Sequence, residues 1–308
     1  PVQREHQMIL DARSKGPLAK LGVYTKLSGP GWLQSAITLG GATLTSSLYL
    51  GVLGGFAFLW LQPLAMILGI VMLGAISYVT LSVKERPFEA INRHVNPVLG
   101  WGWLLATMMA NLVWSISTFA MATAGLRQNL LPGILGAESG ISNFAGNLIS
   151  VGLLVVIAFV VVWFYGSGRK GVMIFEIILK IMVGVIVICF FGVVIKLALS
   201  KGLDWGGIFS GIVPDVGLLS SPADSLGALI DDVDPRFREF WTARIVGEQR
   251  SVMIAALGAA VGINMTVLLP YTMLQRGWNR DFRGLAVFDL STGLFIPYLF
   301  TTACVIIA

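Results

Sequence analysis

Apolar residues fill long stretches of the chain, and polar or charged residues gather in the segments between them. With about 20 apolar residues per membrane crossing, the pattern predicts seven spanning helices, near residues 31–50, 55–80, 98–125, 147–165, 172–199, 251–274 and 285–308. Hydrophobic residues make up 56% of the 308 positions, and charged residues only 12%. The fold class is therefore predicted to be an all-α polytopic membrane protein.

Two of these spans contain residues that interrupt a helix. The first carries Gly40 and Gly41, followed by a run of Thr and Ser, and the sixth carries Gly262 and Asn264 within "LGAAVGINMTVLLPY". In lipid, backbone groups freed by a break must face protein or a water-filled cavity. Two interrupted spans are typical of inverted-repeat transporters, whose substrate site lies at the breaks near the membrane midplane. The alternative is that both breaks are glycine kinks used only for packing.

The basic residues between the spans predict the orientation of the chain. They gather in the N-terminal segment and after the second, fourth and sixth spans, and the positive-inside rule makes that side cytoplasmic. We expect an integral protein of the cell (inner) membrane, divided into a cytoplasmic N-terminal segment (1–28), a first five-helix repeat (29–199), an extracytoplasmic loop (200–250) and the start of a second repeat (251–308). The apolar end of the sequence predicts truncation after the seventh helix. Residues 235–250 are predicted to form a short surface helix.

Three of the charged residues inside the predicted spans are candidates for a functional role. Glu176 and Lys180 are one helical turn apart in the fifth span, an order and spacing that favour an ion pair. Asp289 lies in the seventh span, within reach of Arg280 or Arg283. Charges at this depth must be paired, and they often mark ion pathways. Two interpretations therefore stay open for all three residues: structural ion pairs, or a gate or ion relay.

The sequence offers little for catalysis. It contains no nucleophile triad, zinc motif or phosphate-binding loop, and the spans carry no paired Asp residues or HExxH motif. The "GSGRKG" stretch at 166–171 matches a dinucleotide pattern, but the apolar run before it is too long for a strand, so we interpret it as a basic turn between two membrane helices. We predict a protein that is not an enzyme, with no cofactor. Its expected partners are the lipid bilayer and a small solute or metal ion, with no nucleic acid.

Several stretches resemble one known family of transporters. "GPGWLQSAITLGGATLTSSLYLG", "EIILKIMVGVIVICFF" and "LGAAVGINMTVLLPYTMLQ" are similar to the first, fifth and sixth helices of the NRAMP divalent-metal transporters. The resemblance implies an inverted-repeat transporter fold with discontinuous first and sixth helices. It also implies proton-coupled uptake of Mn²⁺ or Fe²⁺ at a site between the breaks of those two helices.

The chain departs from that family at the metal ligands. Where the first helix of the family has Asp-Pro-Gly-Asn, this sequence has Gly-Gly-Ala-Thr at 40–43, and where the sixth has Met-Pro-His, it has Gly-Ile-Asn at 262–264. The resemblance leaves backbone carbonyls and neutral side-chain oxygens as candidates, and the metal ligands stay unknown. The predicted substrate-binding residues are Ile37, Gly40, Gly41, Thr43, Ala259, Gly262 and Asn264.

The polar residues around the breaks are neutral. The predicted cavity is lined by Gln34, Thr38, Thr43, Thr45, Ser46, Ser47, Asn111, Trp114, Ser117, Asn264 and Thr266. Such a lining, together with the positive ends of broken helices, suits a small neutral solute or an anion better than a bare divalent cation. The sequence therefore predicts a membrane transporter of a small solute or ion. The alternative is a non-transporting membrane sensor or assembly subunit that keeps the fold.

Overall fold

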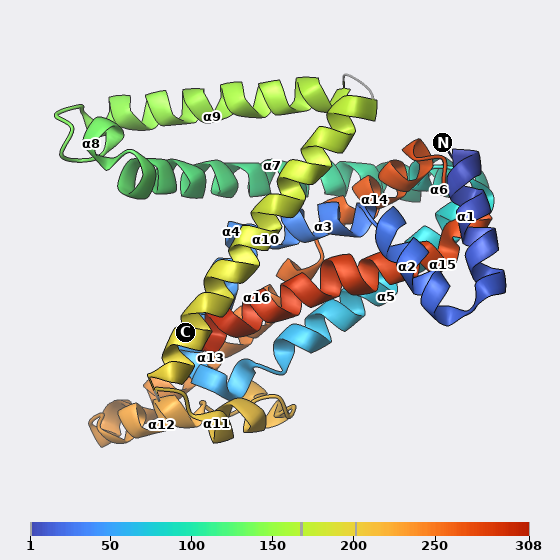
Figure 1. The fold of residues 1–308 in the computed structure, drawn as a ribbon. Helices are drawn as coiled ribbons and strands as arrows, with labels where there is room; N and C mark the ends of the chain where they lie inside the picture. Colours follow the sequence, from blue (N-terminus) through green and yellow to red (C-terminus); the bar gives the residue numbers. More distant parts are fainter. Residues whose placement is uncertain (1, 167–168, 201, 308) are drawn as a thin grey trace. The chain divides into compact units, whose positions relative to one another are not determined.

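The computed structural model describes residues 2–166, 169–200 and 202–307, and within these ranges the chain forms helices, turns and no strand. Seven of the described helical segments are long and apolar enough to cross a membrane. The chain divides into two compact units, residues 1–90 with 180–308 and residues 91–179 (Figure 1). The predicted all-α polytopic class is confirmed.

The larger unit contains both ends of the chain. Its helices are α1 (Val2–Lys15), α2 (Pro17–Leu27), α3 (Pro30–Thr38), α4 (Gly41–Gly54), η1 (Gly55–Phe58), α5 (Leu61–Val83), α11 (Trp205–Ser210), η3 (Val216–Leu219), α12 (Asp224–Asp231), α13 (Pro235–Ala260), α14 (Ile263–Gln275), η4 (Arg280–Phe282), α15 (Arg283–Leu290), η5 (Ser291–Phe295) and α16 (Ile296–Ile307). Two further helices, α6 (Pro87–His94) and α10 (Arg169–Leu199), each have residues in both units.

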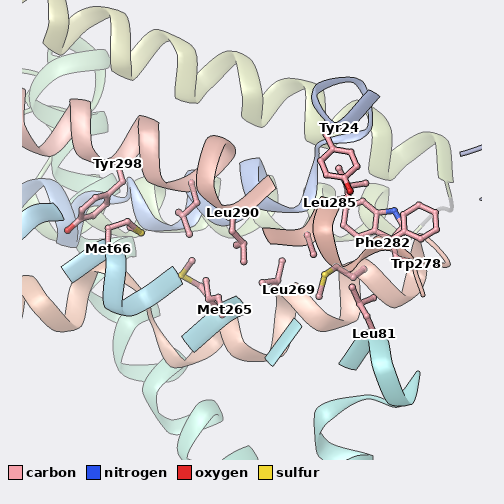
Figure 2. Close-up of a cluster of buried hydrophobic side chains, with 14 of the residues drawn as sticks. Tyr24, Met66, Leu81, Met265, Leu269, Trp278, Phe282, Leu285, Leu290 and Tyr298 are labelled. Carbon is pink, nitrogen blue, oxygen red and sulfur yellow. The ribbon is translucent and has the colours of Figure 1, made fainter. Parts of the chain in front are cut away.

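The core of this unit is built where α5, α14, α15 and α16 pack together. Met66 on α5, Met265 and Leu269 on α14, and Leu290 on α15 are all at most 2% exposed, and Figure 2 shows them gathered between these helices. Tyr298 on α16 is fully buried in the same cluster. The packed side chains fix α14 and α15 beside α3, the helix that carries the first half of the first span.

The N-terminal segment is helical and packs onto this core. Tyr24 on α2 is 4% exposed, and its ring lies 5.5 Å from that of Phe288 on α15. On α1, Ile9 is fully buried, and His6 Nε2 lies 2.7 Å from a carboxylate oxygen of Asp281. These contacts place the two N-terminal helices against the start of the seventh span.

The sixth span begins earlier than the apolar pattern predicts. Helix α13 runs without interruption from Pro235 to Ala260, so the predicted surface helix at 235–250 is its first part. Asp234 caps the helix by accepting a hydrogen bond from the Arg236 N–H at 3.0 Å, and Pro235 occupies the first turn, where a missing N–H costs nothing. The helix continues without a stop until the break at 261–262. Its charged first part and its apolar second part therefore form one element.

The smaller unit consists mainly of two long helices joined by a compact loop. Helix α7 (Pro97–Gly125) continues into a π-helical turn, η2 (Leu126–Leu130), and after α8 (Pro132–Leu135) the chain enters α9 (Asn143–Gly166). Helices α7 and α9 pack against each other (Figure 1). The predicted basic turn at 166–171 contains residues 167–168, which lie outside the described residues.

Candidate functional site

The first and sixth spans are each interrupted, and the two interruptions are hydrogen-bonded to each other. Helix α3 ends at Thr38 and α4 begins at Gly41, while α13 ends at Ala260 and α14 begins at Ile263. The Thr43 hydroxyl donates to the Ala259 carbonyl at 3.1 Å, and the Thr38 hydroxyl donates to the Ala260 carbonyl at 3.2 Å. The last carbonyls of a helix lack intrahelical partners, so two threonines of the first span satisfy the end of α13.

The other oxygens predicted at the site also have protein donors. The Ile37 carbonyl accepts the Gly40 N–H at 3.3 Å, and the Asn264 side-chain oxygen accepts the Met265 N–H at 3.0 Å. Gly40 and Gly262 hold extended backbone, with φ and ψ of −74° and 174° and of −79° and 154°. The Leu39 N–H also points to the Ile37 carbonyl, so this oxygen has two backbone donors, the number that a carbonyl oxygen accepts.

A buried chain of polar groups leads away from the first break. The Tyr298 hydroxyl donates to Gln62 Oε1 at 2.6 Å, Gln62 Nε2 donates to the Ser47 hydroxyl at 3.4 Å, and Ser47 donates to the Thr43 carbonyl at 2.9 Å. All four residues are at most 3% exposed. The network ties α5 and α16 to α4. Gln62 and Tyr298 are missing from the predicted site residues, although Gln62 is a lone amide at the start of an apolar span.

The middle of α3 carries buried polar groups that have no protein partner. Gln34 and Ser35 are fully buried, and both amide atoms of Gln34 and the hydroxyl of Ser35 make no hydrogen bond. Gln34 precedes Thr38 by four residues, so both side chains leave the same face of the helix. A buried amide without a partner costs about 1–3 kcal/mol, so a polar ligand or water beside Gln34 would recover that free energy.

The N-terminal end of α3 is held by a buried carboxylate. Asp289, 1% exposed on α15, accepts the Gly29 N–H at 3.0 Å and the Gly31 N–H at 2.6 Å, and it also accepts the Ser28 hydroxyl. The first N–H groups of a helix lack intrahelical partners and attract negative charge. The sequence puts Arg280 and Arg283 within reach of Asp289; in the structure Arg283 donates to the Ser82 hydroxyl and lies over the Tyr78 ring.

Two cations hold the carbonyls on the other side of the same junction. Lys180 Nζ donates to the Ser28 carbonyl at 3.3 Å, and Arg276 donates to the Leu27 carbonyl at 3.4 Å. The side chain of Glu176, predicted to pair with Lys180, lies outside the described residues. Asp289, Lys180 and Arg276 thus hold residues 27–31, which we call the α2–α3 junction.

The predicted cavity residues are spread over both units. Gln34, Thr38, Thr43, Ser47 and Thr266 are buried in the larger unit, whereas Thr45 is exposed and Ser46 is half-buried. Asn264, on α14 of the larger unit, is half-buried, and Asn111, Trp114 and Ser117 lie on α7 in the smaller unit.

The comparisons with known proteins decide the family. The model for Nramp, the natural resistance-associated macrophage protein-like family, matches residues 31–308. The chain belongs to the NRAMP family. Searches of curated proteins and of solved structures gave no match. NRAMP proteins transport metal ions across membranes and are not enzymes, so the chain is an integral, multi-pass membrane transporter protein.

This NRAMP chain has an unusual donor set at its helix breaks. Among the described residues, no group of three or more His, Cys, Asp or Glu side chains could hold a metal ion. The sulfur of Met265 is a soft atom beside the breaks, and it lies 3.4 Å from the Thr38 hydroxyl oxygen. Met265 is fully buried and was not among the predicted site residues. The described part of the site therefore offers hydroxyls, amides, carbonyls and one thioether, all of them neutral.

Proposed function

We propose that this NRAMP protein transports a small, hydrogen-bonding solute through a site between its two helix breaks. The observation that carries the proposal is the pair of fully buried, unpartnered polar side chains on α3, Gln34 and Ser35, with Gln34 one turn from the break. Native structures leave few buried polar groups unpaired. A solute that accepts a hydrogen bond from the Gln34 amide nitrogen and donates one to the amide oxygen would satisfy atoms that have no partner within the protein.

The charges of the site favour a neutral or anionic solute. A divalent ion that loses water inside the membrane needs compensating negative charge. The polar side chains that form hydrogen bonds at the breaks, those of Thr38, Thr43 and Asn264, carry no negative charge. The nearest predicted acid, Asp289, is engaged at the N-terminal end of α3. We therefore assign hydrogen bonding, and not charge neutralisation, as the means of recognition.

A second candidate substrate is a divalent metal ion, which membership of the NRAMP family favours. It would rely on the predicted Ile37 and Ala259 carbonyls and on the sulfur of Met265. Neutral oxygen donors bind such ions weakly compared with carboxylates, so this candidate ranks behind the neutral solute.

We further propose that the α2–α3 junction works as a gate. Asp289 and Lys180 hold residues 28–31 through hydrogen bonds to backbone groups, and α3 cannot tilt away from α15 without breaking them. The gate fits the predicted cytoplasmic location of the N-terminal segment, at the inner end of the first span. Glu176 stays a predicted member of this gate.

Mn²⁺ influx into proteoliposomes separates the two candidate substrates. The protein is reconstituted, an entrapped metal-quenched dye reports Mn²⁺ entry, and empty liposomes give the background. We expect Mn²⁺ influx at the background rate. We also expect uptake of at least one solute from a panel of radiolabelled small polar molecules, and Gln34→Leu should abolish that uptake. Saturable Mn²⁺ influx would establish the metal candidate. A correctly inserted protein that takes up nothing would support the sensor or assembly role.

A further inference from the structure

The smaller unit contains a cavity of about 430 Å³ where α7 ends and α9 begins. Its lining includes Ala124, Thr123, Arg127, Gln128, Asn147 and Val151. Both helices belong to apolar segments long enough to cross a membrane, residues 97–130 and 143–164, and residues 131–142 connect them. Two consecutive spans joined by a short loop end at the same membrane surface, so the cavity lies near the level of the lipid headgroups.

Arg127 brings a positive charge to this cavity, and the groups to which it donates are neutral. Its Nε donates to the Leu135 carbonyl at 2.7 Å, and its Nη2 and Nη1 donate to the side-chain oxygens of Asn143 and Asn147. All three acceptors are neutral, and within the described ranges no ion pair joins Arg127 to a carboxylate. Asn143 and Asn147 lie in the first two turns of α9, a 24-residue helix. The positive end of that helix adds to the charge of Arg127.

A second group at the cavity lacks a partner. Thr123 is 7% exposed and lines the cavity, and its buried hydroxyl makes no hydrogen bond. It precedes Arg127 by four residues, so the hydroxyl and the guanidinium leave the same face of the helical segment. A ligand with an anionic oxygen would satisfy this hydroxyl and balance the charge of Arg127 at once.

The cavity is apolar on its deeper side. Ala120 and Ala124 precede Arg127 on α7, and Val151 follows Asn147 on α9, so all three lie nearer the middle of the two spans than the cation does. The cationic and amide groups of the lining thus lie toward the surface, with Gly136 and Ala137 of the loop, and the Thr123 hydroxyl is the polar side-chain group farther in. A phospholipid has the same order of groups, with a phosphate outside and glycerol and acyl carbons inside.

We propose that this cavity binds an anionic phospholipid, whose phosphate lies beside Arg127 and accepts a hydrogen bond from Thr123. The helix-break site of the larger unit takes no part in it. Basic pockets between membrane helices bind anionic headgroups on the cytoplasmic or matrix side of other proteins; the predicted orientation places this one on the extracytoplasmic side, where a fixed guanidinium supplies the same charge.

The test uses thermal unfolding of the purified protein in neutral detergent, followed by tryptophan fluorescence. Short-chain phosphatidylglycerol, short-chain phosphatidylcholine and inorganic phosphate are titrated separately at one ionic strength. The variant is Thr123→Val, which keeps the shape and removes the hydroxyl. The matched control is Thr107→Val on the same helix, whose hydroxyl is also buried but donates to the Trp103 carbonyl at 2.8 Å.

We expect phosphatidylglycerol to raise the unfolding temperature of the parent more than phosphatidylcholine does. Thr123→Val should weaken the apparent affinity about tenfold, the effect of losing one hydrogen bond to a charged group, and Thr107→Val should leave it unchanged. An equal response to both lipids, or equal weakening by both variants, would overturn the proposal. Stabilisation by inorganic phosphate without stabilisation by phosphatidylglycerol would also overturn it and assign the site to free phosphate. The comparison of lipids on the parent decides the question even where a variant does not fold.

Discussion

The two halves of α3 treat their buried polar groups in opposite ways. At its start, the N–H groups of Gly29 and Gly31 are taken by the Asp289 carboxylate. About 5 Å along the helix, at 1.5 Å per residue, Gln34 and Ser35 are buried equally deeply, and their side-chain polar atoms have no partner.

Under the proposed function, the contrast separates polar groups that hold α3 in place from polar groups that contact the solute. Groups that the fold satisfies by itself, as at the α2–α3 junction, hold α3 in place. Groups that it leaves unsatisfied reduce its stability, and they are retained where a ligand uses them. Variants on either side of this division should therefore affect stability very differently.

The largest effect is expected from Asp289→Asn. The amide keeps one acceptor oxygen and turns an NH₂ group toward backbone donors, so the hydrogen bonds to Gly29 and Gly31 cannot both survive. We expect the free energy of unfolding to fall by about 3 kcal/mol, measured by denaturant titration in mixed micelles. Asp234→Asn is the control, because asparagine caps α13 as well as aspartate does. Equal losses in both variants would mean that Asp289 does not hold α3.

A smaller loss is expected from Gly31→Ala at the same junction. An added Cβ would lie 2.3 Å from the Asp289 carbonyl oxygen, too close for any carbon atom, so α3 and α15 must separate. We expect about 2 kcal/mol of destabilisation in the same titration. Gly22→Ala on α2 has free space around its Cβ and should be neutral or stabilising by up to about 1 kcal/mol. An alanine at 31 that costs nothing would show that the two helices do not approach this closely.

The polar chain at the first break should tolerate change better. Tyr298→Phe removes the hydroxyl that donates to Gln62 at 2.6 Å and leaves a buried amide oxygen with one partner fewer. We expect a loss of about 1–2 kcal/mol in stability. Tyr78→Phe, at a tyrosine that is 56% exposed, serves as the control and should change stability by less than about 0.5 kcal/mol. A loss no larger than that of the control would mean that the network does not support α4.

Local sequence signals predicted the spans and the places where they break. Gly262 stands inside a segment long and apolar enough to cross a membrane, whereas Gly40 directly precedes such a segment, Gly41–Phe58; the structure ends one helix and begins another at each. The start of α13 was missed because the charged residues at 235–250 resemble a surface segment, while nothing in them stops a helix.

The partners of the buried polar residues could not be predicted in this way. Asp289 and Gly31 are 258 residues apart, and Tyr298 and Gln62 are 236 apart. Their pairing depends on how α3, α5, α15 and α16 pack, which no local pattern records. The sequence predicts that both Gln34 and Thr38 line the cavity. It could not show that the Thr38 hydroxyl has a hydrogen-bond partner and the Gln34 amide has none, because this also depends on packing.

Thermal unfolding of Gln34→Leu beside Gln249→Leu tests the central contrast most directly. Both glutamines are fully buried, but Gln249 accepts the Ala223 N–H at 2.8 Å and donates to the carbonyls of Leu218 and Ser221. We predict that Gln249→Leu lowers the unfolding temperature by several degrees, whereas Gln34→Leu leaves it unchanged or raises it, because leucine removes an unsatisfied amide. A fall for Gln34→Leu as large as that for Gln249→Leu would show that the Gln34 amide is structural, and it would contradict the proposed solute site.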